Sequence, residues 1–162
     1  MQNTTTSETT RIADQITRMA EGGAWHGPSI RDNLTGVTAQ QAAARPISGA
    51  HTIWEIVHHL TAWANEVEGR LQRDAHPLHG EEDWPPVTAT DDAAWETARA
   101  ALHDAHARLR MAVREFPASR LGETVPGTDP LPEHSFHVLL HGLAQHDAYH
   151  TGQIAILKRA SG

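Results

Sequence analysis

Cysteine is absent from this sequence of 162 residues. Its absence excludes disulfide bonds, cysteine-ligated zinc sites and a cysteine nucleophile, so any thiol chemistry requires a small-molecule thiol. No stretch of the chain reaches the roughly 18 consecutive apolar residues that a transmembrane helix needs, and we expect no membrane partner. The sequence also contains neither a phosphate-binding loop nor a dinucleotide-binding fingerprint.

Basic residues are scarce as well. The 13 lysines and arginines are outnumbered by 20 aspartates and glutamates, which gives a net charge of −7, and the basic residues form no run. This charge disfavours a phosphate backbone as partner, so we expect no nucleic acid. Residues 1–10 lack the basic start and apolar centre of a signal peptide, which predicts a cytoplasmic protein. We expect residues 1–9 to form a disordered tail and residues 10–160 to form one domain.

Apolar residues recur at helical spacing through most of the chain, and no alternating strand pattern or internal repeat is visible. The sequence therefore predicts an all-α protein with four main helices. Thr52 and Glu55 fit a capping box, and Thr90 or Asp91 caps the third helix. Ile12, Ile16 and Met19 mark the first helix, which Gly22 and Gly23 end. The second helix is expected at 52–71. The third runs from Trp95 to Phe116 and is ended by Pro117, and the fourth is expected at 132–159.

The segments 22–50, 75–90 and 117–131 are too long to be simple turns. Connections of this length are often functional. The first segment is expected to hold short helices near 29–34 and 38–44. Trp25, His26 and Trp84 are candidates to cover a site between the helices, or alternatively to close the ends of the bundle as core residues.

The fourth helix carries two histidines four residues apart, and this spacing lets His146 and His150 point at one position. Both fall within the apolar stripe of that helix, whereas His134, His137 and His141 fall on the opposite, solvated face. Unpartnered imidazoles inside a core would cost roughly 1 to 3 kcal/mol each, which favours a metal site. The alternative is a pair of core histidines bonded to neighbouring side chains. The stripe consists of Phe136, Leu139, Leu140, Leu143, Ile154 and Leu157.

A third ligand has to come from another helix, and His59 of the helix at 52–71 is the best candidate. It lies beside Ile56 and Trp63 at the edge of the apolar stripe, while His58 is turned about 100° further, towards solvent. Glu66 shares the phase of His59 and is either an exposed carboxylate or a further ligand or support of the site.

Three neutral imidazoles leave a coordination position open, as in catalytic zinc sites. Nitrogen ligands favour zinc first and nickel second. Asp147 and Tyr149 are the candidate catalytic residues. Asp147 could orient a ligand imidazole, accept a proton or pair with an arginine, and Tyr149 could donate a hydrogen bond near the open position.

Four motifs together carry a family resemblance. They resemble the DinB/YfiT-like superfamily of metal-dependent hydrolases from about residue 10 to residue 159. The resemblance implies a four-helix bundle with up-down-down-up connectivity, often dimeric, and a divalent metal bound by one histidine of the second helix and two of the fourth, here His59, His146 and His150. The motifs are Gly23-Ala24-Trp25-His26-Gly27-Pro28-Ser29, His51-Thr52-Ile53-Trp54-Glu55-Ile56-Val57-His58-His59-Leu60, Asp83-Trp84-Pro85 and His146-Asp147-Ala148-Tyr149-His150-Thr151-Gly152-Gln153-Ile154.

The resemblance also implies a class of reaction, because the superfamily includes enzymes that use bacillithiol, mycothiol or glutathione. We therefore expect a metal-dependent enzyme that transfers such a thiol to an electrophile, acting as a homodimer. Hydrolysis by a metal-bound hydroxide is the alternative among enzymes. A metal- or ligand-binding stress protein without turnover is the alternative outside them, and fold-level analogy alone does not decide between these.

Overall fold

The computed structural model describes residues 6–72, 77–126 and 133–162. In these ranges the chain is helical, with a single isolated bridge between Thr124 and Ser135. This confirms the predicted all-α fold. The elements are α1 (Glu8–Glu21), α2 (Ile30–Leu34), α3 (Ala39–Ala43), α4 (Ile53–Leu71), α5 (Asp92–Glu115), the 3₁₀ helix η1 (Ala118–Arg120) and α6 (Phe136–Ala160).

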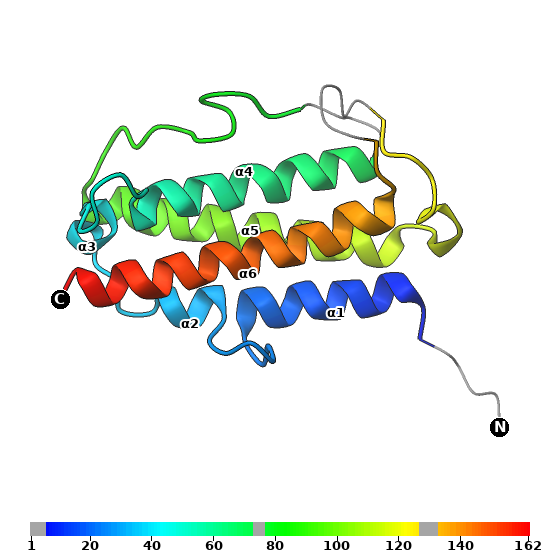
Figure 1. The fold of residues 1–162 in the computed structure, drawn as a ribbon, viewed down its shortest axis with the longest axis horizontal. Helices are drawn as coiled ribbons and strands as arrows, with labels where there is room; N and C mark the ends of the chain where they lie inside the picture. The colour runs from blue at the N-terminus through cyan, green and yellow to red at the C-terminus, as the bar shows by residue number, and fades with distance from the viewer. Residues whose placement is uncertain (1–5, 73–76, 127–132) are drawn as a thin grey trace.

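The four long helices form a bundle with up-down-down-up connectivity. Figure 1 shows that α1 and α6 run in one direction and that α4 and α5 run in the other. Helix α5 packs against α1 and α4, and α6 packs against α4 and α1. Because α4 and α5 are parallel neighbours, the chain has to return along the whole bundle between them. This return places the segment around Asp83 and Trp84 alongside α4.

The helix boundaries follow from capping side chains. The predicted capping box of Thr52 and Glu55 is present, and Asp91, one of the two predicted candidates, caps α5 through the backbone N–H of Ala94. The side chain of Ser135 accepts from the N–H of Val138, so α6 begins at Phe136 and later than predicted. Residue 132, the predicted start, lies outside the described residues.

Helix α1 begins earlier than the sequence analysis expected. Ser7 accepts a hydrogen bond from the N–H of Thr10, so Glu8 and Thr9 belong to the helix although the sequence assigned them to the tail. Gly22 ends the helix with φ of 134°, a conformation that favours glycine. Residues 1–5 lie outside the described part of the chain.

The apolar faces of the long helices bury two clusters that lie along the bundle. One consists mainly of residues from α1, α4, α5 and α6, including Ile16, Val67 and Leu140. The other joins α2, α3, α4, α5 and the C-terminal half of α6, and includes Trp54 and Trp95. Along α6, His146 and His150 lie between the two clusters, whereas His59 lies among the residues that α4 contributes to the second cluster. None of the described helices is long and apolar enough to cross a membrane.

The structure corrects the interpretation of Glu66 as an exposed carboxylate. Its side chain is buried, and its carboxylate accepts a hydrogen bond of 2.6 Å from Nε of Arg70, which is also buried. Arg70 lies one turn further along α4 and provides the compensating charge. Glu66 is therefore part of a buried ion pair rather than an exposed carboxylate, and it is not in the group of residues that could hold a metal with His59.

Candidate metal centre

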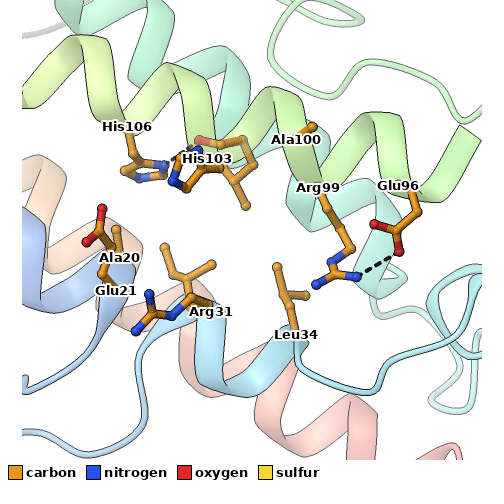
Figure 2. Close-up of a pocket in the computed structure, with 11 residues that line it drawn as sticks. Ala20, Glu21, Arg31, Leu34, Glu96, Arg99, Ala100, His103 and His106 are labelled. Atoms are coloured by element: carbon orange, nitrogen blue, oxygen red, sulfur yellow. Dashed lines mark hydrogen bonds and ion pairs between the residues drawn. The ribbon is translucent and has the colours of Figure 1, made fainter.

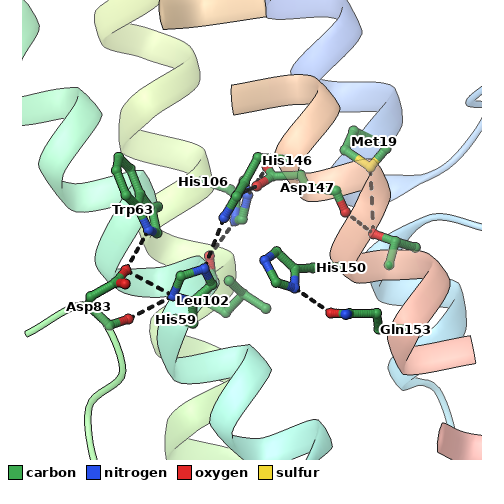
Figure 3. A network of polar contacts seen from close by, with 11 residues as sticks. Met19, His59, Trp63, Asp83, Leu102, His106, His146, Asp147, His150 and Gln153 are labelled. Atoms are coloured by element: carbon green, nitrogen blue, oxygen red, sulfur yellow. Dashed lines mark hydrogen bonds and ion pairs between the residues drawn. The ribbon is translucent and has the colours of Figure 1, made fainter. Parts of the chain in front are cut away.

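Three histidines from two helices converge between α4 and α6. His59 of α4 and His146 and His150 of α6 each place one ring nitrogen within 4.8 Å of the other two. Their ring centroids form a nearly regular triangle with sides of 4.9, 4.7 and 4.5 Å. Figure 3 shows the three rings facing one another in the space between the helices. The structure thus brings together the three residues that helical phase had selected.

The outer nitrogen of each ring faces a hydrogen-bond acceptor. Nδ1 of His59 lies 2.7 Å from the carbonyl oxygen of Asp83, and Nδ1 of His150 lies 2.6 Å from Oε1 of Gln153. Nδ1 of His146 lies 3.3 Å from a carboxylate oxygen of Asp147. Because these partners only accept, each Nδ1 carries the proton and each Nε2 keeps its lone pair.

This set of tautomers fits a divalent metal. The Nε2 atoms of His59 and His146 are 2.9 Å apart, a distance at which either a shared proton or a metal ion has to lie between the two nitrogens. Imidazole ligands at about 2.0–2.1 Å from a tetrahedral zinc ion are roughly 3.3 Å from one another, so small movements suffice for binding. Supporting acceptors on the outer nitrogens are typical of histidine metal ligands.

The segment between α4 and α5 supports one side of the site. Trp84 stacks on the ring of His59 at 3.9 Å and on the ring of His51 at 3.6 Å, so it lies between two parallel imidazoles. Asp83 accepts a hydrogen bond of 2.8 Å from the indole N–H of Trp63, in addition to its contact with His59. These contacts connect the segment to α4 and fix the orientation of His59.

Only one of the three residues predicted to cover the site does so. Trp84 covers His59, which confirms that part of the prediction. The prediction is wrong for Trp25 and His26, because both are exposed and Trp25 is 102% exposed. They belong to the connection between α1 and α2, which Figure 1 shows on the side of the bundle formed by those two helices. They do not close the end of the bundle as core residues either.

His58 is not the solvated residue that its helical phase predicted. Its Nε2 accepts a hydrogen bond of 3.1 Å from the indole N–H of Trp54, and its Nδ1 lies 3.2 Å from the carbonyl oxygen of Pro85. The returning segment covers this face of α4, which periodicity within the helix could not reveal. His58 therefore helps to hold that segment in place but does not point at the three converging histidines.

Behind His146 lies a buried ion pair that the sequence analysis did not find. Asp147 is fully buried, and its second carboxylate oxygen lies 3.0 Å from Nε2 of His106 on α5. Nδ1 of His106 lies 3.0 Å from the carbonyl oxygen of Leu102. Both ring nitrogens of His106 face acceptors, so this histidine is an imidazolium. The partner of Asp147 is thus a histidine, not the arginine considered as an alternative.

The pKa values agree with these protonation states. Burial lowers the pKa of His150 to about 4, with the neighbouring His146 acting in the same direction. Burial also lowers the pKa of His59, although Asp83 opposes the shift. Burial disfavours charge on His106 as well, but the hydrogen bond and charge of Asp147 outweigh it and raise the pKa of His106. For Asp147, burial favours the neutral form, yet hydrogen bonds from His106 and His146 keep its pKa below the ordinary value.

Tyr149, the second candidate catalytic residue, lies at the solvent side of the site. Its ring is edge-on to that of His150 at 5.1 Å between centroids, and it is 65% exposed. Tyr149 can therefore meet a molecule approaching from solvent, whereas Asp147 is closed off from any such molecule. The two residues proposed from sequence as a catalytic pair occupy opposite sides of the histidine cluster.

Two further features lie away from the cluster. Glu8, His137 and His141 bring their ligand atoms within 4.8 Å of one another where α1 and α6 begin, with His137 exposed.

A cavity of about 290 Å³ lies between α1, α2 and α5, with His106 on its wall, and Arg31 and Arg99 beside it (Figure 2). Arg99 is paired with Glu96 at 2.8 Å. None of the three converging histidines lines this cavity.

The sequence was compared with known protein families, curated proteins and solved structures. A family model described as the DinB superfamily matches residues 29–154. This range begins at the cap of α2 and ends within α6, and it contains all three converging histidines. Searches of curated proteins and of solved structures gave no match.

Proposed function

The chain belongs to the DinB superfamily, and from that premise we propose that it is a metal-dependent enzyme that transfers a low-molecular-weight thiol to an electrophile. The observation that carries this proposal is the convergence of three histidine rings, each of which has a hydrogen-bond acceptor at Nδ1 and leaves Nε2 for a metal. In this proposal His59, His146 and His150 bind the metal. The thiol is bacillithiol, mycothiol or glutathione.

The donor set supports zinc as the first choice of metal and nickel as the second. Both ions accept imidazole nitrogen, and the preference between them depends on geometry and supply. Three neutral ligands leave the full charge of a divalent ion in place, and such an ion favours an anionic fourth ligand and lowers the pKa of a bound thiol from its usual value of about 8.5.

The residues around the cluster take different parts in the proposed reaction. Asp147 is a positioning residue, because it holds His146 and is itself closed off from solvent by His106. Trp84 and Asp83 hold His59 in the same way from the other side. In this proposal Tyr149, at the solvent side, donates a hydrogen bond near the open coordination position. The sulfur forms the new bond to carbon, the leaving group departs with its electron pair, and the thiol proton passes to solvent.

Enzyme assays test this proposal directly. The protein loaded with zinc or nickel should accelerate the reaction of at least one of the three thiols with 1-chloro-2,4-dinitrobenzene or bromobimane, and removal of the metal by a chelator should abolish the rate. Cleavage of simple esters or amides without any thiol transfer would instead favour hydrolysis by metal-bound hydroxide. Inactivity in both assays would favour a binding protein without turnover.

Metal binding should persist to lower pH than an unperturbed imidazole allows. An ordinary histidine becomes protonated below about pH 6.5 and then loses its lone pair. Because the pKa of His59 is lowered and that of His150 is lowered to about 4, protons compete for these ligands only at lower pH. We expect full metal content at pH 6 and progressive release towards pH 4, measured by elemental analysis after gel filtration. Release of most of the metal between pH 7 and pH 6 would contradict these pKa shifts.

We also propose that the protein is a homodimer. The proposal rests on the resemblance to a superfamily that is often dimeric, and two-fold dimers are the commonest soluble oligomers. Light scattering coupled to gel filtration should give about twice the chain mass of 17.7 kDa. A monomer at micromolar concentration would remove the dimer and leave the metal site unaffected.

A further inference from the structure

A cavity of about 400 Å³ lies between α4 and α6, next to the three histidines. Trp63 and Val67 of α4 form one wall, and Leu139 and Leu143 of α6 form the other. His146 closes one end, so a proposed metal ligand is part of the cavity wall. Figure 3 shows Trp63 beside the ring of His146, and the two ring centroids are 5.7 Å apart. The cavity therefore borders the candidate metal site through His146.

The described part of the wall disfavours negatively charged ligands. Among the described residues that line the cavity, the ionisable ones are Glu133, His134 and His146, and no lysine or arginine is present. Among these described residues a carboxylate or phosphate finds no cationic partner, and it meets the negative charge of Glu133. Removing a charge from water without such a partner is costly. Apolar ligands, in contrast, gain free energy when they leave water for a wall of this kind.

Trp63 gives the cavity a flat and fixed surface. Its indole N–H donates to Asp83, and this bond holds the ring on the side of His146. An indole fixed in this way offers its face or edge to an aromatic ligand, and such pairs add roughly 0.5–1.5 kcal/mol beyond area burial. The wall therefore favours flat, uncharged molecules over flexible polar ones.

We propose that this cavity binds the acceptor substrate and that the acceptor is an uncharged, mainly apolar electrophile such as a haloarene. The assignment rests on the thiol transfer proposed above. An acceptor seated between Trp63 and Leu143 has its reactive carbon near His146 and thus near a thiolate held at the three histidines. For a haloarene, the sulfur bonds to the ring carbon and the halide leaves with its electron pair.

Two glycines of α6 provide a matched pair of variants. A Cβ atom added at Gly142 or at Gly152 would meet no atom of a neighbouring element or side chain within 4 Å, so both positions have room where a side chain begins. Gly142 lines the cavity, whereas Gly152 does not. Glycine is one of the least favourable residues in the interior of a helix, so replacing it should favour the helical conformation, and both variants should fold. Gly142→Phe therefore fills the cavity, and Gly152→Phe is its control.

Calorimetric titration with 2,4-dinitrotoluene, an unreactive analogue of 1-chloro-2,4-dinitrobenzene, tests the assignment without any turnover. We expect 2,4-dinitrotoluene to bind the full-length protein with and without zinc. The Kd should rise at least about 10-fold in Gly142→Phe, which corresponds to about 1.4 kcal/mol of binding free energy. In Gly152→Phe the Kd should change less than about 2-fold. Metal content should be the same in both variants. No binding of 2,4-dinitrotoluene, or equal affinity in the two variants, would overturn the assignment.

Measurements of turnover then distinguish the apolar acceptor site from the proposed thiol transfer. With a thiol that the enzyme uses, Gly142→Phe should raise the KM for 1-chloro-2,4-dinitrobenzene and leave the KM for the thiol unchanged. The carboxylate analogue 4-chloro-3,5-dinitrobenzoate should be the poorer substrate. If 2,4-dinitrotoluene binds and Gly142→Phe blocks it but no thiol is transferred, the apolar site stands and the proposed reaction fails. If thiol transfer is equally fast in both glycine variants, the reaction stands and the cavity is not the acceptor site.

Discussion

Replacing His59 with alanine should weaken metal binding by more than about 100-fold, which exceeds the 10- to 100-fold loss typical of residues that only support a ligand. The reason is that His59 is the one member of the cluster contributed by α4, and without it His146 and His150 lie on a single helix with no opposing donor. Competition with a chromogenic chelator measures the affinity. The variant should also lose thiol transfer.

His58→Ala is the matched control on the neighbouring residue. It removes an acceptor from the indole of buried Trp54 and a contact with the carbonyl of Pro85, so it should lower the free energy of unfolding by about 1–3 kcal/mol. Metal affinity should change much less than in His59→Ala. If His58→Ala released the metal and His59→Ala retained it, the assignment of the ligand on α4 would be wrong.

Asp147→Ala should destabilise the metal-free protein by about 3–5 kcal/mol, because it leaves the imidazolium of His106 buried without its counter-charge. Both side chains are inaccessible, with exposures of 3% for His106 and 0% for Asp147, so solvent cannot replace the lost partner. Urea denaturation in the presence of a chelator measures this cost separately from metal binding. Asp147→Asn keeps one acceptor oxygen and should cost less.

The double variant His106→Leu with Asp147→Leu is the control for this ion pair. Replacing both partners with apolar residues removes the buried charge altogether, so the double variant should be more stable than Asp147→Ala. Its metal affinity should still fall, because His146 loses the acceptor that orients its ring. A cost below about 1 kcal/mol for Asp147→Ala would show that His106 and Asp147 do not form a charged pair.

The same pair predicts a pH dependence. A histidine with a raised pKa contributes stability that is complete below its unfolded value of about 6.5 and is lost as the pH rises through the folded value. An aspartate with a lowered pKa contributes stability that is complete above its unfolded value of about 3.9 and is lost as the pH falls. The stability difference between the native protein and Asp147→Ala should therefore be largest between about pH 4 and pH 6.5.

The sequence predicted the long helices well because each one signals its own boundaries. Thr52 and Asp91 are good caps, and the apolar positions of α4 recur at helical spacing, so no tertiary information was needed. The positions of His59, His146 and His150 relative to the apolar stripes of their own helices were also sufficient to predict that the three side chains converge. The same criterion would have found His106, which falls in the apolar stripe of Leu102 and Leu109, had it been applied to the third helix.

Two of the errors concern contacts between elements. His58 was assigned to solvent because helical phase cannot show that the segment from Asp83 to Pro85 returns over that face of α4. Trp25 was expected near the site because aromatic residues in a long connection do not show which side of the bundle the connection takes. The error at Glu66 arises within one helix, because Arg70 lies one turn further along α4 and balances the charge of Glu66, which makes burial possible. For His58 and Trp25 the decisive information lies outside the pattern that a single helix carries.

X-ray absorption of the zinc-loaded protein can show directly whether three imidazoles hold a metal ion and leave one position for a thiol. We expect about three nitrogen ligands at roughly 2.0–2.1 Å together with one exchangeable oxygen ligand, and one sulfur ligand at about 2.3 Å after the thiol is added. His150→Ala should not give this spectrum. A spectrum with four protein ligands that does not change on addition of any of the three thiols, or protein that takes up no zinc, would show that the three histidines do not form an open metal site.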